Sequence, residues 1–223
     1  MGKIFNIDGP LVSFLGKVAD LVWLNIIFIV FSLPIVTIGA STTAMYYVAM
    51  KMAKNEEGYI FRDFFKAFKS NFKQSSIIWL ISATIGVVLM VNFRILASWD
   101  SVVSKALICI ICVIAIMLIF MSLYVYPLLA RFENTVSVTM TNALLISLAQ
   151  FPKTLLMIAF SVVPTALVIF SAAWIPLIVL GAFSLVAYTN SSFMVTIFKK
   201  FEQPETEEDV EHTDKKEDKN SEK

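Results

Sequence analysis

Apolar residues along the chain are gathered into long stretches that carry no charge. No Asp, Glu, Lys, Arg or His occurs in residues 21–50, 74–93, 106–130 or 154–198. A helix crosses a bilayer core with about 20 mostly apolar residues, so the last stretch is long enough for two crossings. The pattern predicts an all-α polytopic membrane helix bundle with about five transmembrane helices, near residues 21–40, 75–93, 106–130, 154–172 and 174–198.

The first stretch is longer than one straight crossing requires, and two residues interrupt it. Pro34 removes a backbone donor, and Gly39 loosens the chain. We favour a kinked span with a helical extension toward Lys54. The alternative is a broken helix that lines a cavity, because irregular backbone at membrane depth must be buried in protein or face water. A second crossing within residues 21–50 would move the N-terminus to the other side.

Residues 59–74 have the pattern of an amphipathic helix that lies in the membrane interface. At 100° per residue the phenylalanines fall on one arc, and the basic residues fall on a narrower arc beside it. Rings can enter the acyl boundary while the cations reach anionic headgroups. The predicted surface for lipid or a protein partner consists of Phe61, Arg62, Phe64, Phe65, Lys66, Phe68, Lys69, Phe72 and Lys73.

The second half of the chain contains three further features. Residues 134–150 are uncharged but polar at their start, which indicates a second interfacial helix. Residues 154–198 are expected to form a hairpin of two spans, with its turn at residues 171–174. Residues 202–223 hold ten acids and four lysines, together with the single histidine, His212. So polar a segment cannot compensate its ordering entropy, and we expect a disordered acidic tail.

Composition agrees with the membrane assignment: 58% of the residues are hydrophobic and only 16% are charged, against about 25% charged residues in an average soluble domain. The formal net charge of +1 conceals the acidic tail, because the tail carries −6 and residues 1–201 carry +7. Cys109 and Cys112 form a C-x-x-C motif inside an uncharged span. A thiolate is hard to form there, so we expect both cysteines to be packing residues.

Basic residues assign the sides of the membrane. With five spans, ten Lys and Arg side chains fall on the side of the loop at residues 51–73, and four fall on the other side. The positive-inside rule then puts that loop and the C-terminus in the cytoplasm and the N-terminus outside. The expected location is the bacterial plasma membrane.

Ionisable groups, which enzymes and ion-coupled transporters use, are missing from every predicted span. No loop contains a phosphate-binding glycine motif or a metal-ligand spacing. We therefore expect a protein that is not an enzyme, with no cofactor, no metal and no nucleic-acid partner. Asn25, Asn92 and Asn190 are expected to join helix to helix, and the spacing of Ser82 and Gly86 would let a neighbouring backbone approach closely.

Three segments of the chain resemble a known family. They are "LNIIFIVFSLPIVTIGASTTAMYYVAMK", "EEGYIFRDFFKAFKSNFKQ" and "YPLLARFENTVSVTMTNALLISLAQFPKTL", which are similar to segments of the YesL-like family of bacterial integral membrane proteins, a domain of unknown function. The resemblance covers residues 6–201. It implies a plasma-membrane protein of Gram-positive bacteria, typically encoded beside carbohydrate uptake transporters, sugar-degrading enzymes or sensor kinases. It assigns no catalytic residue.

Hypotheses of three classes follow. The first is a non-enzymatic accessory or regulatory protein of carbohydrate uptake or sensing, with the lipid bilayer, a carbohydrate ABC transporter or a sensor kinase as candidate partners. The second is a transport component such as a sugar permease subunit, with "NALLISLAQFPKT" as a coupling helix. That segment lacks the acid-Ala-Ala and glycine such loops usually contain. The third, a membrane enzyme, is disfavoured by the missing acid and base groups.

Overall fold

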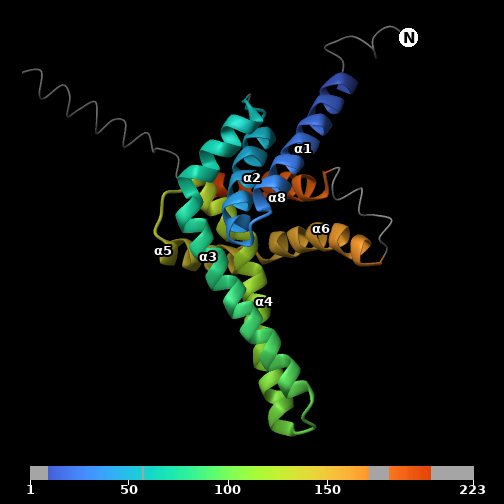
Figure 1. The fold of residues 1–223 in the computed structure, drawn as a ribbon, viewed down its shortest axis with the longest axis vertical. Helices are drawn as coiled ribbons and strands as arrows, with labels where there is room; N and C mark the ends of the chain where they lie inside the picture. Colours follow the sequence, from blue (N-terminus) through green and yellow to red (C-terminus); the bar gives the residue numbers. More distant parts are fainter. Residues whose placement is uncertain (1–9, 57, 171–180, 202–223) are drawn as a thin grey trace, which may run out of the picture.

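The computed structural model describes residues 10–56, 58–170 and 181–201. The described residues form an all-helical molecule without strands (Figure 1). The expected turn at residues 171–174, the acidic tail and His212 lie outside the described residues. In chain order the elements are α1 (Pro10–Ser32), η1 (Ile35–Thr37), α2 (Ile38–Ala53), α3 (Ile60–Ala97), α4 (Val102–Arg131), α5 (Val136–Ala149), α6 (Phe151–Phe170) and α8 (Phe183–Phe201).

The first apolar stretch folds back on itself. α1 ends at Ser32, and a short 3-10 turn, η1, leads into α2 after Pro34. The Lys17 Nζ donates to Asn55 Oδ1 at 2.8 Å, which brings the start of α1 beside the loop that follows α2. The favoured prediction of one kinked span is therefore wrong. The start of α1 and the loop after α2 lie at the same end of the molecule, so the sequence-based placement of the N-terminus opposite that loop is not supported.

Helix α2 is the centre of the fold. Ten of its 16 residues are buried, and it packs against α1, α3, α4 and α8. Its small residues permit this burial: Gly39, Ala40, Ala44 and Ala49 are all covered. In lipid the hydrophobic effect does little to bring helices together, so close packing must do so. Small residues allow the backbones of neighbouring helices to approach closely enough for this packing.

The tightest contact of α2 is with α3. A Cβ atom added to Gly39 would lie 2.5 Å from the Ser75 carbonyl oxygen and 2.7 Å from the Trp79 Cβ. One turn further along α2, the Thr43 and Ser75 hydroxyls are 2.9 Å apart and buried. Helix α3 is thereby fixed against α2 at its middle.

Helix α3 joins two predicted elements into one. Its 38 residues run without a break from Ile60 to Ala97, a length of about 57 Å at 1.5 Å per residue. The sequence predicted a separate interfacial helix at residues 59–74 and a span at 75–93. No proline or glycine lies near residue 74 to end the first piece, and the Ser75 contact with α2 lies at the junction.

The distal part of α3 and the first part of α4 form a two-helix arm, defined as residues 79–119, that extends away from the other helices (Figure 1). Between Ile78 and Phe120 only Ser104 is buried. At the tip, the Val103 backbone N–H donates to Ser101 Oγ and the Ser101 N–H donates to Ser104 Oγ, which is the capping-box arrangement at a helix start. Apolar side chains cover the outside of the arm.

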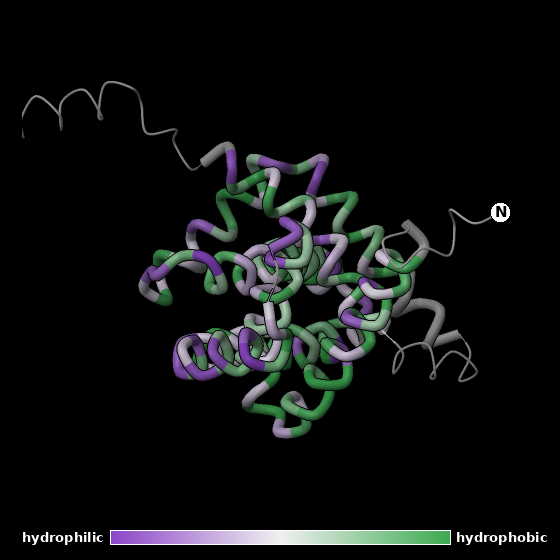
Figure 2. Tube along the Cα trace, turned by 90° about the horizontal axis from the view of Figure 1, so that it is seen from above, coloured by the Kyte–Doolittle hydropathy of each residue, from purple (hydrophilic) through white to green (hydrophobic). Residues whose placement is uncertain are grey.

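Figure 2 shows the whole molecule from above, coloured by the hydropathy of each residue. Hydrophobic residues make up most of the chain in this view, and hydrophilic residues are gathered in shorter segments. Among the described residues, three helices are long and apolar enough to cross a membrane, in residues 12–32, 60–97 and 102–131. A fourth candidate is the pair α5 and α6, which are bent by 100° relative to each other. The molecule is thus an all-α membrane protein with three or four candidate spans in its described part, where the sequence predicted five in the whole chain.

Candidate functional site

The predicted phenylalanine stripe forms the first turns of α3 and meets a ring from α1. The Phe31 ring lies 5.4 Å from that of Phe64 and 5.1 Å from that of Phe68, measured between centroids. Tilted and edge-on pairs at these distances are favourable beyond the area they bury. Phe31, which the sequence analysis did not single out, closes this aromatic cluster because α1 folds back beside α3.

Burial divides the stripe into two sets. Phe64 is 0% exposed and belongs to the core, and Phe68 is half-buried. Phe61, Phe65 and Phe72 keep 52%, 46% and 40% of their surface exposed. Phe64 therefore does not contact lipid or a partner, contrary to its place on the predicted surface, and the remaining accessible rings are those of Phe61, Phe65 and Phe72.

The basic residues of the same helix are all exposed: Arg62, Lys66, Lys69 and Lys73. None of them has an ion-pair partner within the part of the chain that the structure describes. Within these described residues, no ion pair neutralises the four charges. We call Phe61, Phe65, Phe72 and these four cations the exposed α3 surface.

An ion pair fixes the start of α3 to the end of α2. The Lys51 Nζ lies 2.6 Å from Asp63 Oδ2, and this hydrogen bond raises the pKa of the Lys51 ammonium above its ordinary value. Gly58 leaves room for the pair, since a Cβ there would collide with Asp63 Oδ2 and lie 3.1 Å from Lys51 Nζ. Asp63 also lies in the first turn of α3, where its negative charge interacts favourably with the positive end of the helix dipole.

Two hollows of about 290 and 530 Å³ share several lining residues, among them Arg131 at the end of α4. Lys51 and Lys54 reach the smaller hollow, and Lys66 reaches the larger. We call these two hollows and their lining residues, which include Lys51, Lys54, Lys66 and Arg131, the charged end. The Gln74 side-chain amide donates to the Asn134 carbonyl oxygen, which ties the turn between α4 and α5 to α3.

Buried polar groups join α8 to the other helices. The Ser184 N–H donates to Asn25 Oδ1 at 3.2 Å, and the Ser184 hydroxyl donates to the Leu21 carbonyl at 2.7 Å. The Asn190 Nδ2 donates to Ser161 Oγ at 3.2 Å and to the Tyr46 hydroxyl at 3.4 Å. These bonds agree with the predicted packing role of Asn25 and Asn190.

Asn92 behaves differently from the other two asparagines. Its side chain is exposed and donates to the Val88 carbonyl of its own helix at 2.8 Å, so it makes no hydrogen bond to a second helix within the described residues. Cys109 and Cys112 are free and exposed on the arm. Among the described residues no group of His, Cys, Asp and Glu could hold a metal ion.

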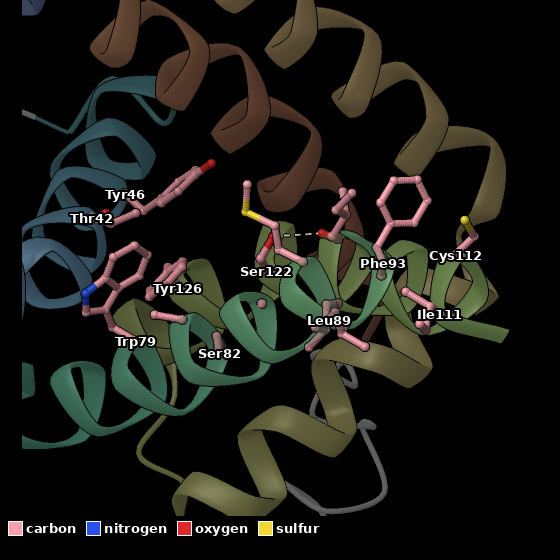
Figure 3. A pocket seen from close by; sticks show the side chains of 16 residues that line it. Thr42, Tyr46, Trp79, Ser82, Leu89, Phe93, Ile111, Cys112, Ser122 and Tyr126 are labelled. Atoms are coloured by element: carbon pink, nitrogen blue, oxygen red, sulfur yellow. Dashed lines mark hydrogen bonds between the residues drawn. The ribbon is translucent and has the colours of Figure 1, made fainter. Parts of the chain in front are cut away.

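A pocket of about 630 Å³ is lined by residues of α2, α3 and α4 (Figure 3). Sequence reasoning did not predict it, although the spacing of Ser82 and Gly86 marked the same face of α3. We expected a neighbouring backbone at Gly86, but the structure has no atom within 4 Å of a Cβ built there. The open space belongs to the pocket.

Comparison with known proteins gives a family and two relatives. Residues 21–93 match the family described as "Protein of unknown function, DUF624". The chain is 30% identical over 212 residues to the uncharacterized protein YesL of Bacillus subtilis (strain 168), covering 93% of this chain and 99% of the relative. It is 25% identical over 186 residues to the uncharacterized protein YteU of the same organism, covering 82% and 81%. No solved structure matches.

Proposed function

The chain belongs to the DUF624 family of YesL-like membrane proteins, and from this premise we propose that it is a non-enzymatic accessory or regulatory protein that binds a partner through helix contacts. The exposed α3 surface is the observation that carries the proposal. Three accessible rings lie on the same helix as four cations that have no ion-pair partner among the described residues. Phe64 is buried and anchors this helix in the core. A rigid aromatic and basic surface of this kind suits a partner's groove or an anionic membrane surface.

Carbohydrate uptake or sensing is the process that we propose for this protein, on the resemblance to a family encoded beside sugar transporters and sensor kinases. The candidate partners are therefore a carbohydrate ABC transporter or a sensor kinase in the bacterial plasma membrane. The lack of charged residues in residues 21–50, 74–93 and 106–130 supports a role without acid and base chemistry.

We further propose that the charged end faces the cytoplasm. Lys17, Lys51, Lys54, Lys66 and Arg131 gather there, whereas the tip of the arm carries only Arg94 and Lys105 as basic residues. The positive-inside rule favours this orientation, and the folded-back α1 then starts on the cytoplasmic side. Reporter fusions ahead of Lys17 and after Gly58 should report the same side. Reporters on opposite sides would refute the orientation.

Crosslinking in native membranes tests the proposed contact. Replacing Phe61, Phe65 and Phe72 with serine should release the protein partner that is crosslinked to the region around Lys66 in the unaltered chain. The matched control replaces Val87, Val88 and Val91, three exposed apolar residues of the arm, and should retain that partner. If the ring variant kept the same crosslinked partner and the same sugar-dependent growth, the docking role would be wrong.

The second candidate function is a sugar permease subunit. Helix α5 is a separate short helix that makes a sharp bend with α6, and it exposes Leu145 and Leu148. Such a helix could insert into an ATPase subunit, which favours this alternative. Deletion of the gene should then reduce uptake of a labelled sugar by intact cells, and replacing Leu145 and Leu148 with serine should reproduce the defect. Normal uptake in the deletion strain would count against this function.

A further inference from the structure

The pocket between α2, α3 and α4 lies within the charge-free part of the chain. On α3 its lining begins at Trp79 and ends at Phe93, and on α4 it begins at Ile111 and ends at Tyr126. All of these positions fall in residues 74–93 and 106–130, which carry no charge. The pocket therefore faces the hydrocarbon region of the bilayer.

Polarity changes along the pocket in one direction. Tyr46, Ser82 and Tyr126, from α2, α3 and α4, lie toward one end, and Ser122 lies near the middle (Figure 3). The Tyr46 hydroxyl accepts a hydrogen bond from Asn190 of α8. At the other end the lining is apolar, with Leu89, Phe93 and Ile111 (Figure 3). Since α4 continues from Tyr126 to Arg131 and the charged end, the hydroxyl end points toward the membrane surface. A membrane amphiphile has the same order of polar and apolar parts.

Two hydroxyls at the polar end are unused within the described chain. Ser82 and Tyr126 have no hydrogen-bond partner among the described residues. Thr42 and Ser122 donate to carbonyls of their own helices, at 2.7 and 2.8 Å, but their oxygens can still accept. A polar group left without a partner in lipid is costly, so an occupant with acceptor oxygens at this depth would be stabilised.

The dimensions of the pocket fit a lipid chain. From Trp79 to Phe93 the helix rises about 21 Å, which is more than half of the roughly 30 Å hydrocarbon core. The volume of about 630 Å³ lies in the usual range of small-molecule sites. Tyr46 and Tyr126 line the polar end and are buried. We infer that they limit the pocket there, so a partner's transmembrane helix, which would continue past this depth, fits less well than a molecule that ends there.

The lining also restricts the headgroup. It contains no Lys, Arg, His, Asp or Glu, so no cation is present to bind a phosphate at the polar end. We propose that the pocket binds one acyl chain and the glycerol ester of an uncharged glycerolipid of the diacylglycerol class. The ester oxygens accept hydrogen bonds from Ser82 and Tyr126, and the chain extends past Gly86 toward Phe93. This site is separate from the exposed α3 surface.

Photocrosslinking of the full chain tests the site. The probe is a diacylglycerol with a diazirine in one acyl chain, added to nanodiscs of phosphatidylcholine that contain the purified protein. We expect the crosslinked peptides to come from residues 79–93 and 111–122. Unlabelled diacylglycerol in excess should reduce the yield about tenfold, whereas the same excess of anionic phosphatidylglycerol should leave it unchanged. Equal competition by both lipids would contradict the proposal that the site selects an uncharged headgroup.

A second test compares a substitution that fills the pocket with a matched control substitution outside it. Gly86→Phe places a ring in the open space of the pocket, and Gly16→Phe places the same ring where nothing lies within 4 Å on the exposed part of α1. We expect Gly86→Phe to lower the crosslinking yield at least tenfold and Gly16→Phe to preserve it. Equal yields from the two variants would overturn the proposal.

The pair Ser82→Ala and Tyr126→Phe keeps the shape of the pocket and removes its two unused hydroxyls. In this double variant the yield should fall several-fold, while circular dichroism and gel filtration remain those of the unaltered chain. An unchanged yield would show that the hydroxyls do not hold the ester. If Gly86→Phe failed to fold by the same two measurements, the double variant would decide the question alone.

Discussion

The two halves of α3 belong to the same unbroken helix and yet have opposite surroundings. In residues 60–78 the helix packs on α1 and α2, and the space around Gly39 is so tight that no Cβ fits. In residues 79–97 no residue is buried, and the space at Gly86 is empty. One half therefore contributes buried residues to the core of the protein, and the other half contributes none.

The difference between the two halves of α3 shows which features make one membrane helix pack against another. Apolar side chains gain little from leaving lipid for a neighbouring helix, so close packing and interhelical hydrogen bonds decide which helices associate. The first half of α3 has both, through Gly39 and through the Thr43 and Ser75 hydroxyls. The second half is more apolar but has neither device toward α2, and it extends away from α2 together with the first part of α4 (Figure 1).

The largest effect that would sharpen this comparison is expected at Phe64. Truncating a fully buried ring leaves a cavity, and Phe64→Ala should lower the free energy of unfolding by about 3–5 kcal/mol. Phe93→Ala, at an exposed ring of the arm, should cost less than about 1 kcal/mol. Denaturant titration in detergent micelles, followed by circular dichroism, measures both. Equal losses would mean that the two halves are not packed differently.

The two glycines give the next effect. Gly39→Ala forces the backbone of α3 away from α2, and overpacking of this kind costs about 1–3 kcal/mol. Gly86→Ala meets no atom and should change the stability by no more than about 0.5 kcal/mol. The same titration compares them. A neutral Gly39→Ala would contradict the close approach of α2 and α3.

A smaller effect is expected from the hydroxyl pair between α2 and α3. In a double-mutant cycle, Thr43→Val and Ser75→Ala should show a coupling of about 0.6 kcal/mol, the average for such bonds between membrane helices. Pairing Thr43→Val with Ser82→Ala, on the arm half of α3, should show none. Coupling to Ser82 would indicate that the arm folds back onto α2.

The smallest effect is that of the ion pair at the start of α3. Lys51→Met should cost about 0.5–1 kcal/mol, because both side chains are partly exposed. The pKa of Lys51 is raised from 10.5, so its contribution is complete below that pH and is lost as the pH rises through the higher folded value. In unfolding titrations, Lys51→Met and the unaltered chain should differ in stability at pH 9, and the difference should shrink as the pH rises through the raised pKa of Lys51. A constant difference between the two proteins would exclude this titration.

The sequence was most informative where the chain lacks charge. The charge-free residues 74–93 and 106–130 lie within α3 and α4, and the break at Pro34 lies where a proline predicts one. These are local consequences of composition and backbone chemistry. The all-α membrane fold could therefore be predicted before any contact was known.

The fold-back of α1 and the burial of Phe64 could not be predicted, because periodicity identifies a face and not what covers it. The phenylalanine arc has the same shape whether lipid or another helix meets it. The contact between Lys17 and Asn55 and the approach of Phe31 to Phe64 depend on helices that are distant in sequence. The pocket likewise could not be predicted, because its lining comes from three helices, α2, α3 and α4, whose relative placement the sequence pattern of one helix does not give.

The tip of the arm has a consequence for how the protein enters the membrane. Under the proposed orientation, the charged side chains of the arm that must be carried across the bilayer are those of Arg94, Asp100 and Lys105. Asp100 and Lys105 lie 2.9 Å apart as an ion pair, so two of the three can cross with their charges matched. Insertion of this hairpin thus needs little translocation of charge, and the loop between its helices can remain short.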